Sequence, residues 1–328
     1  MMNYIYVGAV IALLVAVHVL RQYLVKAEQR INTDEPFDGL SYQVGAACVG
    51  HRKIHTTPEQ TIVCMPGFLE DQRYFTELYN DPEIELILIN SANYHFPVTN
   101  PQVQLTGFSN EQGYAENTVK YDAAVLNWAL KNLASTNNVR VHAHSRGGAV
   151  ALEAASQDPT LHKDNEFILE APVLPNGKVW LPLDNVLGGR ASQYLLPLFV
   201  PLIKRAPVNL YAPILYRPLT PRKKMLIAGL FYAPKTYQTI IDNVTDLEQW
   251  MATADKSLFD NINNGVILIG QKDTVLDSAS MLASAKNAGD NFRIIETQGT
   301  THFITQDAPD YIPSLSNSPA PSRSVASH

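Results

Sequence analysis

Short apolar runs alternate with longer amphipathic stretches along most of the chain. The runs expected to form strands are residues 61–65, 85–90, 139–142, 166–170, 265–269 and 291–296. Apolar positions recur at helical spacing in residues 72–79, 117–133, 147–157 and 278–287, and residues 39–50 are candidates for a leading hairpin at the sheet edge. Uninterrupted apolar runs are typical of strands buried on both faces. The pattern predicts an α/β fold with a mostly parallel, doubly wound sheet covered by helices on both faces.

One interval, from about 173 to 251, breaks this alternation. It is apolar and punctuated by proline, and it shows neither strand alternation nor a single amphipathic helix. Because it lies between two predicted strands of the sheet, we interpret it as an inserted, mainly helical cap. The chain then divides into an N-terminal helix at 1–30, a core in two parts at 31–172 and 252–308, the cap at 173–251, and a Ser/Pro/Ala-rich tail at 309–328 that we expect to be disordered.

The first thirty residues have the composition of a membrane anchor. No charged side chain occurs at 4–20, and Tyr4 and Tyr6 stand at one edge as interfacial aromatic residues. The basic residues that follow are Arg21, Lys26 and Arg30. The positive-inside rule therefore predicts a single-pass anchor with the remaining chain in the cytoplasm. A signal peptide is less well supported, because a basic n-region and a small-x-small cleavage site are both missing. An anchor facing the other way, which would place the chain in an extracytoplasmic space, and a buried core helix remain alternatives.

Composition narrows the class of protein further. With 328 residues, 46% of them hydrophobic, the chain can bury a large core, and its net charge of −6 offers no broad basic field for nucleic acid. The two cysteines, Cys48 and Cys64, make neither a disulfide framework nor a metal site. We therefore expect no nucleic-acid partner and no metal.

A serine occupies a strand–turn–helix pattern at 139–152. The residues two before and two after Ser145 are Ala143 and Gly147, and such small neighbours are what a sharp turn requires. The turn would leave Ser145 Oγ at the end of the strand, with the following N–H groups at a helix N-terminus facing a developing oxyanion. A serine-capped helix is the plainer interpretation of this motif when it is taken alone.

Two further residues could complete a nucleophilic site. Asp273 follows the strand at 265–269 and His302 follows the last strand. The chain order Ser145, Asp273, His302, with each residue in a loop after a strand, resembles the α/β-hydrolase superfamily over roughly residues 36–307 apart from the cap. The resemblance implies a catalytic triad of these three residues.

Other residues compete for the roles of acid and base. Some members of the superfamily take the acid after the strand that Glu170 ends, and Asp277 is also near. His142 belongs to a strand, where packing is the plainer role. His144 is the variable position of the turn, and we expect packing or substrate contact there.

The resemblance also implies an oxyanion hole, completed by a backbone N–H from the loop at 65–68. The expected donors are the N–H groups of Phe68 and Arg146, although Pro66-Gly67 could be an ordinary turn. The motif opens with Ala143 where glycine is commoner, and Met65 stands where many relatives carry histidine. These departures argue against the His-Gly-Gly-Gly type of esterase.

The cap indicates the kind of substrate. Its density of large apolar residues predicts an apolar lid over Ser145 and therefore a hydrophobic acyl group, although the insertion could also pack only on the core. The expected substrate contacts are His144, Leu198, Phe199 and Phe231. The basic residues of the cap, which could meet anionic headgroups or form a solvated face, are Lys204, Arg205, Arg217, Arg222, Lys223 and Lys224.

Together these features predict a serine hydrolase that needs no cofactor. It would cleave a carboxylic ester or thioester, such as a lipid ester, through an acyl-enzyme, and transfer to another alcohol would use the same residues. A serine at the turn, in place of aspartate, disfavours a dehalogenase or epoxide hydrolase. The alternatives are a membrane-tethered protein that binds a hydrophobic ligand without turnover, and a cofactor-free haloperoxidase or C–C hydrolase.

Overall fold

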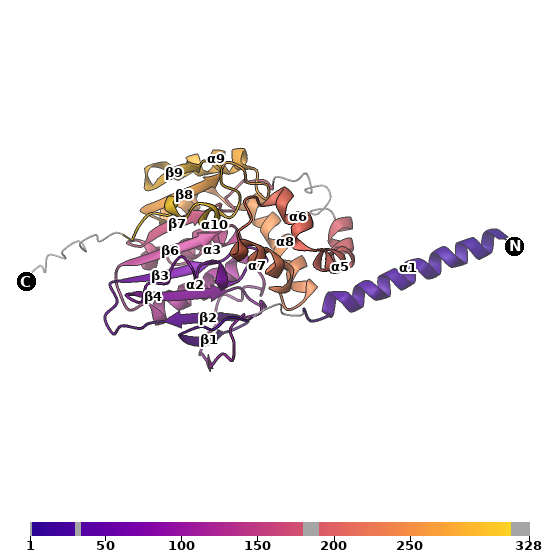
Figure 1. Cartoon of the computed structure of the whole chain (residues 1–328), viewed down its shortest axis with the longest axis horizontal. Coiled ribbons are helices and arrows are strands. Elements are labelled where there is room, and N and C mark those ends of the chain that lie inside the picture. The colour runs from indigo at the N-terminus through magenta and orange to yellow at the C-terminus, as the bar shows by residue number, and fades with distance from the viewer. Residues whose placement is uncertain (1, 30–33, 180–189, 316–328) are drawn as a thin grey trace, which may run out of the picture.

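A mixed sheet forms the centre of the molecule. The structure is a computed structural model that describes residues 2–29, 34–179 and 190–315. In this part of the chain the strands are β1 (Leu40–Val44), β2 (Ala47–Arg52), β3 (Gln60–Met65), β4 (Ile84–Asn90), β5 (Val103–Leu105), β6 (Val139–His144), β7 (Glu166–Glu170), β8 (Asn264–Gly270) and β9 (Phe292–Thr297). They lie in the order β5-β1-β2-β4-β3-β6-β7-β8-β9, and only β2 pairs antiparallel to its neighbours. The predicted fold class is confirmed (Figure 1).

Every predicted strand is present, and the leading hairpin is β1–β2. The short edge strand β5 was not predicted, because its residues are exposed and carry no apolar run. The helix expected at 72–79 is a single 3-10 turn, η1 (Gln72–Tyr74), followed by irregular turns. A helix of two turns has few hydrogen bonds to offset the cost of its nucleation, so periodicity alone does not secure it.

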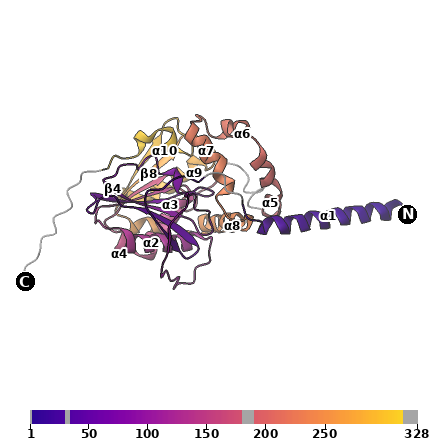
Figure 2. The same cartoon turned by 60° about the horizontal axis from the view of Figure 1, so that its bottom comes forward.

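Helices cover both faces of the sheet. The core helices are α2 (Val119–Leu133), α3 (Arg146–Gln157), α4 (Pro159–His162), α9 (Ser278–Ala285) and α10 (Ile304–Asp307), and the remaining short 3-10 segments are η4 (Lys256–Asn261), η5 (Lys286–Asn291) and η6 (Pro309–Tyr311). Figure 2 shows α2 and α4 on one side of the sheet and α10 on the other.

Each face of the sheet has its own hydrophobic core, because successive side chains of a strand point to opposite faces. In β3, Val63 and Met65 join the core under α2 and α3, whereas Ile62 and Cys64 pack with the aromatic residues Tyr74 and Phe75. This double burial is why the central strands have uninterrupted apolar runs in the sequence.

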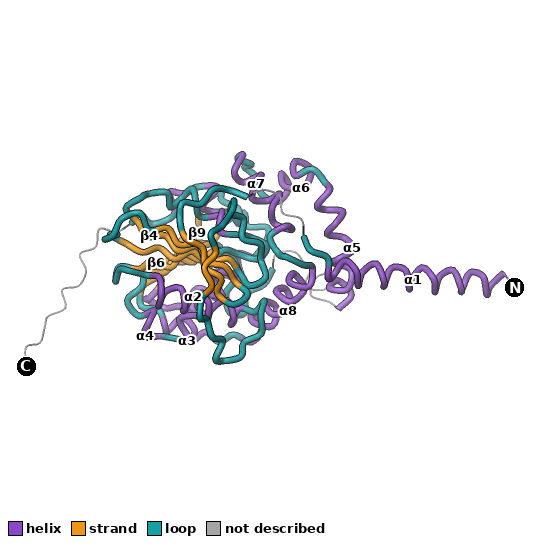
Figure 3. Tube along the Cα trace, turned by 90° about the horizontal axis from the view of Figure 1, so that it is seen from below, coloured by secondary structure: helices purple, strands orange, loops and turns teal. Residues whose placement is uncertain are grey.

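The interval between β7 and β8 is mainly helical in its described part. It contains α5 (Arg190–Arg205), α6 (Val208–Leu215), α7 (Pro221–Gly229), η3 (Leu230–Tyr232) and α8 (Tyr237–Thr253), while residues 180–189 lie outside the described part. Trp250 and Met251 at the end of α8 belong to the main core of the sheet. The other helices gather at one end of the molecule, beside the base of α1 (Figures 1 and 3).

The two ends of the chain differ in how they meet the body. The helix α1 (Met2–Lys26) projects away from it, and its segment Tyr4–Lys26 is long and apolar enough to cross a membrane by length and composition. Near the other end, the Arg140 guanidinium donates hydrogen bonds to the carbonyls of Pro313 (2.7 Å) and Ser314 (2.9 Å). A disordered tail beginning at 309 is therefore wrong for residues 309–315, and residues 316–328 lie outside the described part.

Candidate active site

Ser145 occupies a strained turn between β6 and α3. Its backbone has φ 53° and ψ −120°, a region that residues other than glycine rarely adopt. Three hydrogen bonds hold the turn, each at 2.9 Å: the Ser145 N–H donates to the Glu170 carbonyl, and the N–H groups of Gly148 and Val173 donate to the Ser145 carbonyl. A Cβ on Gly147 would lie 2.3 Å from the Met65 carbonyl oxygen, so only glycine allows this approach of helix to strand.

His302 and Asp273 form a buried pair at the same edge of the sheet. His302 Nδ1 lies 2.7 Å from Asp273 Oδ2, while Asp273 Oδ1 accepts hydrogen bonds from the N–H groups of Val275 and Leu276. A carboxylate held this way orients the imidazole, keeps the proton on Nδ1 and leaves Nε2 as a base. Ser145 Oγ makes no hydrogen bond with any other described residue. The hydrogen bond between a nucleophilic hydroxyl and its base often forms or shortens only when substrate binds.

The loop after β3 lies against Ser145. A Cβ on Gly67 would come within 2.7 Å of Ser145 Cβ. The N–H groups of Gly67, Leu69 and Glu70 all have acceptors, whereas the Phe68 N–H has none among the described residues. The Arg146 N–H is likewise without a partner there, because Arg146 is the first residue of α3. The two expected oxyanion donors are thus N–H groups without a partner among the described residues.

The Arg146 side chain points into the core. Its Nη1 lies 2.6 Å from Asp122 Oδ2, and both side chains are fully buried. This ion pair anchors the start of α3 and leaves only the Arg146 backbone for chemistry.

Glu70 is the site residue that the sequence reasoning missed. Its Oε2 accepts hydrogen bonds from the Gly67 N–H (2.7 Å) and from His144 Nδ1 (2.6 Å). His144 Nε2 lies 2.9 Å from the His302 carbonyl oxygen, and the Tyr74 ring stacks on the imidazole with centroids 4.3 Å apart. His144 is fully buried with both nitrogens occupied, so the structure gives it no contact with substrate.

These contacts favour a positively charged His144. A carbonyl oxygen can only accept, so Nε2 is a donor, and the carboxylate of Glu70 calls for a second donor at Nδ1. Burial alone would lower the pKa of His144, but the charge of Glu70 and its hydrogen bond outweigh this and raise the pKa to about 9. Glu70 Oε1 accepts no hydrogen bond from the described residues and is free for a donor on the substrate or for water.

Glu70, His144 and His302 also offer possible metal ligands, with atoms within 4.8 Å of one another. Because His144 uses both nitrogens in hydrogen bonds, a metal would have to break the pair with Glu70 or the bond to the His302 loop. The arrangement suits the ion pair better than a three-ligand metal site.

Glu170 pairs with His142 and not with His302. It accepts hydrogen bonds from Tyr74 Oη (2.6 Å), from His142 Nε2 (3.0 Å) and from the N–H and Oγ1 of Thr305. Burial alone would raise its pKa, but the hydrogen bond from His142 and the charges of His142 and His144 lower it to about 2. The other competitor, Asp277, caps α9 by accepting from the Ser280 N–H. Neither alternative acid pairs with His302.

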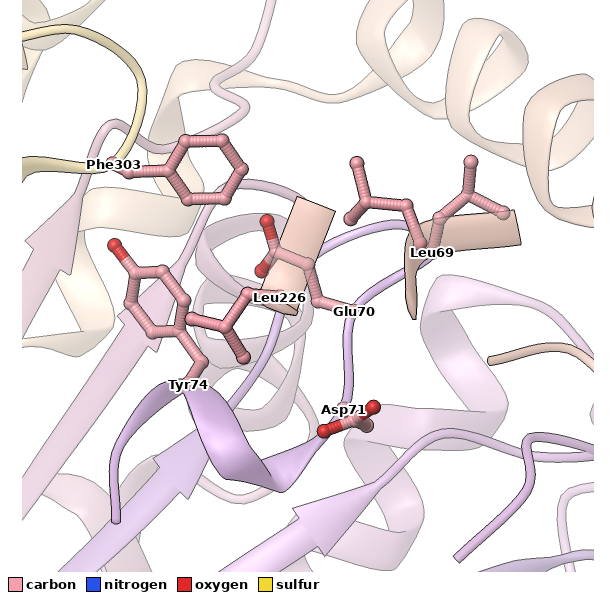
Figure 4. A pocket seen from close by; sticks show the side chains of 7 residues that line it. Leu69, Glu70, Asp71, Tyr74, Leu226 and Phe303 are labelled. Carbon is pink, nitrogen blue, oxygen red and sulfur yellow. The ribbon is translucent and has the colours of Figure 1, made fainter. Parts of the chain in front are cut away.

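A small pocket adjoins this cluster. Its cavity volume is about 10 Å³, and it is lined by Leu69, Glu70, Asp71, Tyr74, Leu226, Leu230 and Phe303. Figure 4 shows the Glu70 carboxylate among these side chains. The cap contributes Leu226 and Leu230, whereas the expected contacts Leu198, Phe199 and Phe231 do not line it.

Comparisons with solved structures identify the fold. An esterase from Exiguobacterium antarcticum (TM-score 0.57, 16% identity) covers 83% of this chain and 96% of its own. A hydrolase from Oleispira antarctica (0.53, 16%) covers 80% and 90%, and a bromoperoxidase from Bacillus anthracis (0.57, 12%) covers 80% and 91%. No family model and no curated protein sequence matches. The chain has the α/β-hydrolase fold, and at these identities the likeness establishes the fold alone.

Proposed function

We propose that the chain is a serine hydrolase that cleaves a carboxylic ester or thioester with a hydrophobic acyl group. The observation that carries the proposal is the buried pair of His302 and Asp273 at the same edge of the sheet as a serine in a strained strand-to-helix turn. A fixed carboxylate, an imidazole with a free Nε2 and a hydroxyl form the set that nucleophilic acyl transfer needs. Nucleophile, acid and base together are more than a binding protein requires.

In the first half of the reaction His302 Nε2 takes the proton of Ser145 Oγ as the oxygen attacks the substrate carbonyl. The tetrahedral oxyanion accepts hydrogen bonds from the Phe68 and Arg146 N–H groups, each worth ~3 kcal/mol when preorganised. As the intermediate collapses, the bond to the leaving alcohol or thiol breaks, and His302 gives that group its proton. The product is an acyl ester of Ser145.

In the second half a water molecule attacks the acyl ester. His302 accepts the proton of the water, the same two N–H groups bind the oxyanion, and collapse returns the proton to Ser145 Oγ and releases the carboxylic acid. Another alcohol in place of water would give acyl transfer.

The lining of the pocket supports a hydrophobic acyl group. Leu69, Leu226, Leu230 and Phe303 offer apolar surface, and each methylene buried there contributes ~0.8 kcal/mol to binding. We expect kcat/KM to rise with acyl chain length over the first few carbons, and a flat response would remove this part of the proposal.

We also propose that α1 anchors the chain in a membrane. Its most apolar window is entirely unburied, and Arg21 and Lys26 follow the uncharged segment, which favours a cytoplasmic body by the positive-inside rule. Protease added outside sealed, right-side-out vesicles tests this orientation. It should leave a cytoplasmic body intact, and cleavage of the body would favour an extracytoplasmic orientation.

A fluorophosphonate probe tests the enzymatic proposal. The probe should label the wild-type chain and fail to label Ser145→Ala. Labelling of neither chain would favour a tethered binding protein, and equal labelling of both would place the nucleophile elsewhere.

A further inference from the structure

Helix α5 presents apolar side chains on two opposite faces. Leu196 and Val200 face inward, where they join a cluster with Tyr237 and Ile240 of α8. Leu195, Phe199 and Leu202 stand at helical spacing on the outward face, and Phe199 and Leu202 are 55% and 61% exposed. Leu210 of α6 is also exposed. A two-faced helix of this kind is expected to have a second apolar partner on its outer side.

The base of α1 fixes where that partner lies. His18 Nδ1 is 2.9 Å from Tyr194 Oη at the start of the described α5 side chains, and Arg21 Nε donates to the Tyr194 carbonyl at 2.8 Å. The Arg21 guanidinium also covers the Tyr194 ring, 4.5 Å from its centroid. Figures 1 and 3 show α5 at the point where α1 leaves the body.

Helix geometry places this contact at a membrane surface. The uncharged segment 4–20 is about 25 Å long at 1.5 Å per residue, close to the thickness of the hydrocarbon layer. Arg21 is the first charge after it and therefore marks the interface, where tyrosine and arginine side chains are favoured. Tyr194 lies at the same level, so the outward stripe of α5 starts at the boundary of the bilayer.

We propose that the outward face of α5 lies in the boundary layer of the bilayer that α1 spans, and that the chain takes a lipid ester directly from this bilayer. The inference rests on the proposed anchor and, for the substrate, on the proposed hydrolase. A helix lying in this layer buries its apolar face among the headgroups and the first methylenes of the acyl chains.

The inward face of α5 packs against the proposed oxyanion loop. Leu24 of α1, Leu196 of α5 and Leu230 pack in one cluster with Phe68 and Leu69 of the oxyanion loop. Leu69 and Leu230 also line the pocket beside Glu70. A helix whose outer face meets the bilayer would therefore be in direct apolar contact, through its inner face, with the proposed oxyanion loop.

The basic residues of the cap contribute less to this surface than their number suggests. Lys223 is fully buried and pairs with Asp307, and Arg222 pairs with Glu35 at 2.7 Å. The expectation of a six-residue basic face is therefore wrong for these two. Apolar contact, and not charge, is the main attraction we infer, so the insertion of α5 should change little with salt.

Spin-label accessibility tests the position of α5 in the full chain. A nitroxide on Phe199→Cys, in phosphatidylcholine vesicles, should collide several-fold more often with oxygen relative to a water-soluble nickel chelate than a nitroxide on Leu105→Cys. Leu105 lies on the edge strand β5 and is 87% exposed. Leu13→Cys in the middle of α1 reports on the anchor. Cys48 and Cys64 are buried, and burial raises the pKa of both thiols, so the label favours the introduced cysteine.

The three labels separate the possible outcomes. A bilayer signal at position 13 with a water signal at 199 would overturn the proposal while leaving the anchor intact. A water signal at both positions would overturn the anchor and, with it, the placement of α5. Dipolar broadening at 199 without oxygen access would show that a second copy of the chain covers the stripe.

Activity tests the delivery of substrate. In Leu195→Ser/Leu202→Ser, the kcat/KM for a long-chain ester in the vesicle membrane, divided by that for a water-soluble acetyl ester, should fall about tenfold or more. Leu105→Ser should leave this ratio unchanged. An unchanged ratio in the double variant would overturn delivery through α5. A wild-type chain that turns over neither ester would refute the proposed function, and the nitroxide result would still decide where α5 lies.

Discussion

His144 Nδ1 lies 2.6 Å from Glu70 Oε2 in a buried ion pair, and His144 directly precedes Ser145 in the chain. Through Gly67 the Glu70 carboxylate holds the loop after β3, and through the His302 carbonyl the His144 imidazolium holds the loop of His302. One pair thus connects three segments that must keep their relative positions if the proposed mechanism holds. The positive charge of His144, the residue before Ser145, therefore has a structural role in the site.

The Glu70–His144 pair predicts a loss of stability in alkaline solution. The pKa of His144 is about 9 in the folded chain, against an ordinary value of 6.5. Its contribution is fully present below pH 6.5 and is lost as the pH rises through 9, with an upper bound of about 3 kcal/mol. Urea unfolding of the wild type between pH 6 and 10 should show this loss.

Glu70→Gln should remove most of this dependence, because a neutral amide no longer favours the imidazolium. The variant should also be less stable than the wild type at pH 6. Glu77→Gln is the matched control, since Glu77 is exposed. Parallel profiles for wild type and Glu70→Gln would contradict the charge assignment of His144.

Asp273 and Glu170 should respond differently to amide substitution. Asp273→Asn removes the acceptor of His302 Nδ1–H, and we expect kcat to fall by ~10⁴-fold with little change in stability. Glu170→Gln disturbs the buried group around His142 and should destabilise the fold by roughly 3 kcal/mol while kcat stays within about tenfold. Steady-state kinetics and unfolding of both variants check this, and the reverse pattern would make Glu170 the catalytic acid.

Gly67→Ala should damage catalysis more than folding. The added methyl would lie 2.6 Å from Glu70 Oε2 and 2.7 Å from Ser145 Cβ, so the oxyanion loop must move. Because one misplaced donor costs about 10²–10³-fold in kcat, a loss of that size is expected with a small change in KM. Gly107→Ala, where a Cβ meets nothing within 4 Å, is the control. Equal activity of the two variants would contradict the assigned oxyanion loop.

Lys223 of the cap should stabilise the fold through its contacts with the loop that carries His302. Its Nζ donates to Asp307 and to Thr301 Oγ1, and Asp307 Oδ2 accepts from the Thr301 N–H. Lys223→Met leaves Asp307 buried without its cation and should cost about 3–5 kcal/mol in the free energy of unfolding. Lys223→Met/Asp307→Asn should recover part of this, and exposed Lys224→Met should have little effect. Additive effects of the two single changes in a double-mutant cycle would refute the coupling.

The sheet and the placement of its loops could be predicted because strong patterns determine them. Residues 166–170 were predicted as a strand and form β7, and parallel pairing then brings the ends of β6, β8 and β9 to one edge. Sequence order therefore sufficed to bring Ser145, Asp273 and His302 to the same region.

The role of Glu70 could not be predicted from the sequence, because it depends on the backbone conformation of the preceding residue. Glu70 and Asp71 are adjacent acids, but Leu69 adopts φ 65°, and the turn directs Glu70 toward His144 while Asp71 pairs with Arg73. A leucine gives no indication of this conformation. An acid three residues after Gly67, in the loop that follows a buried strand, was the only available signal.

The sequence also could not predict which residues of the cap face the pocket. Because α5 has apolar residues on both faces, periodicity could not separate the inward Val200 from the outward Phe199. The pocket takes Leu226 and Leu230 from the later segments α7 and η3. The choice depends on how the cap helices rotate against the body, which tertiary packing decides.

The covalent intermediate offers the most direct test of the proposed chemistry. Intact-mass measurement of the chain, quenched within milliseconds of mixing with an activated butyryl ester, should show one added butyryl group, and peptide mapping should place it on Ser145. Ser145→Ala should show no adduct and no burst of the leaving group. Turnover by Ser145→Ala at the wild-type rate, or an adduct on another residue, would contradict Ser145 as the nucleophile.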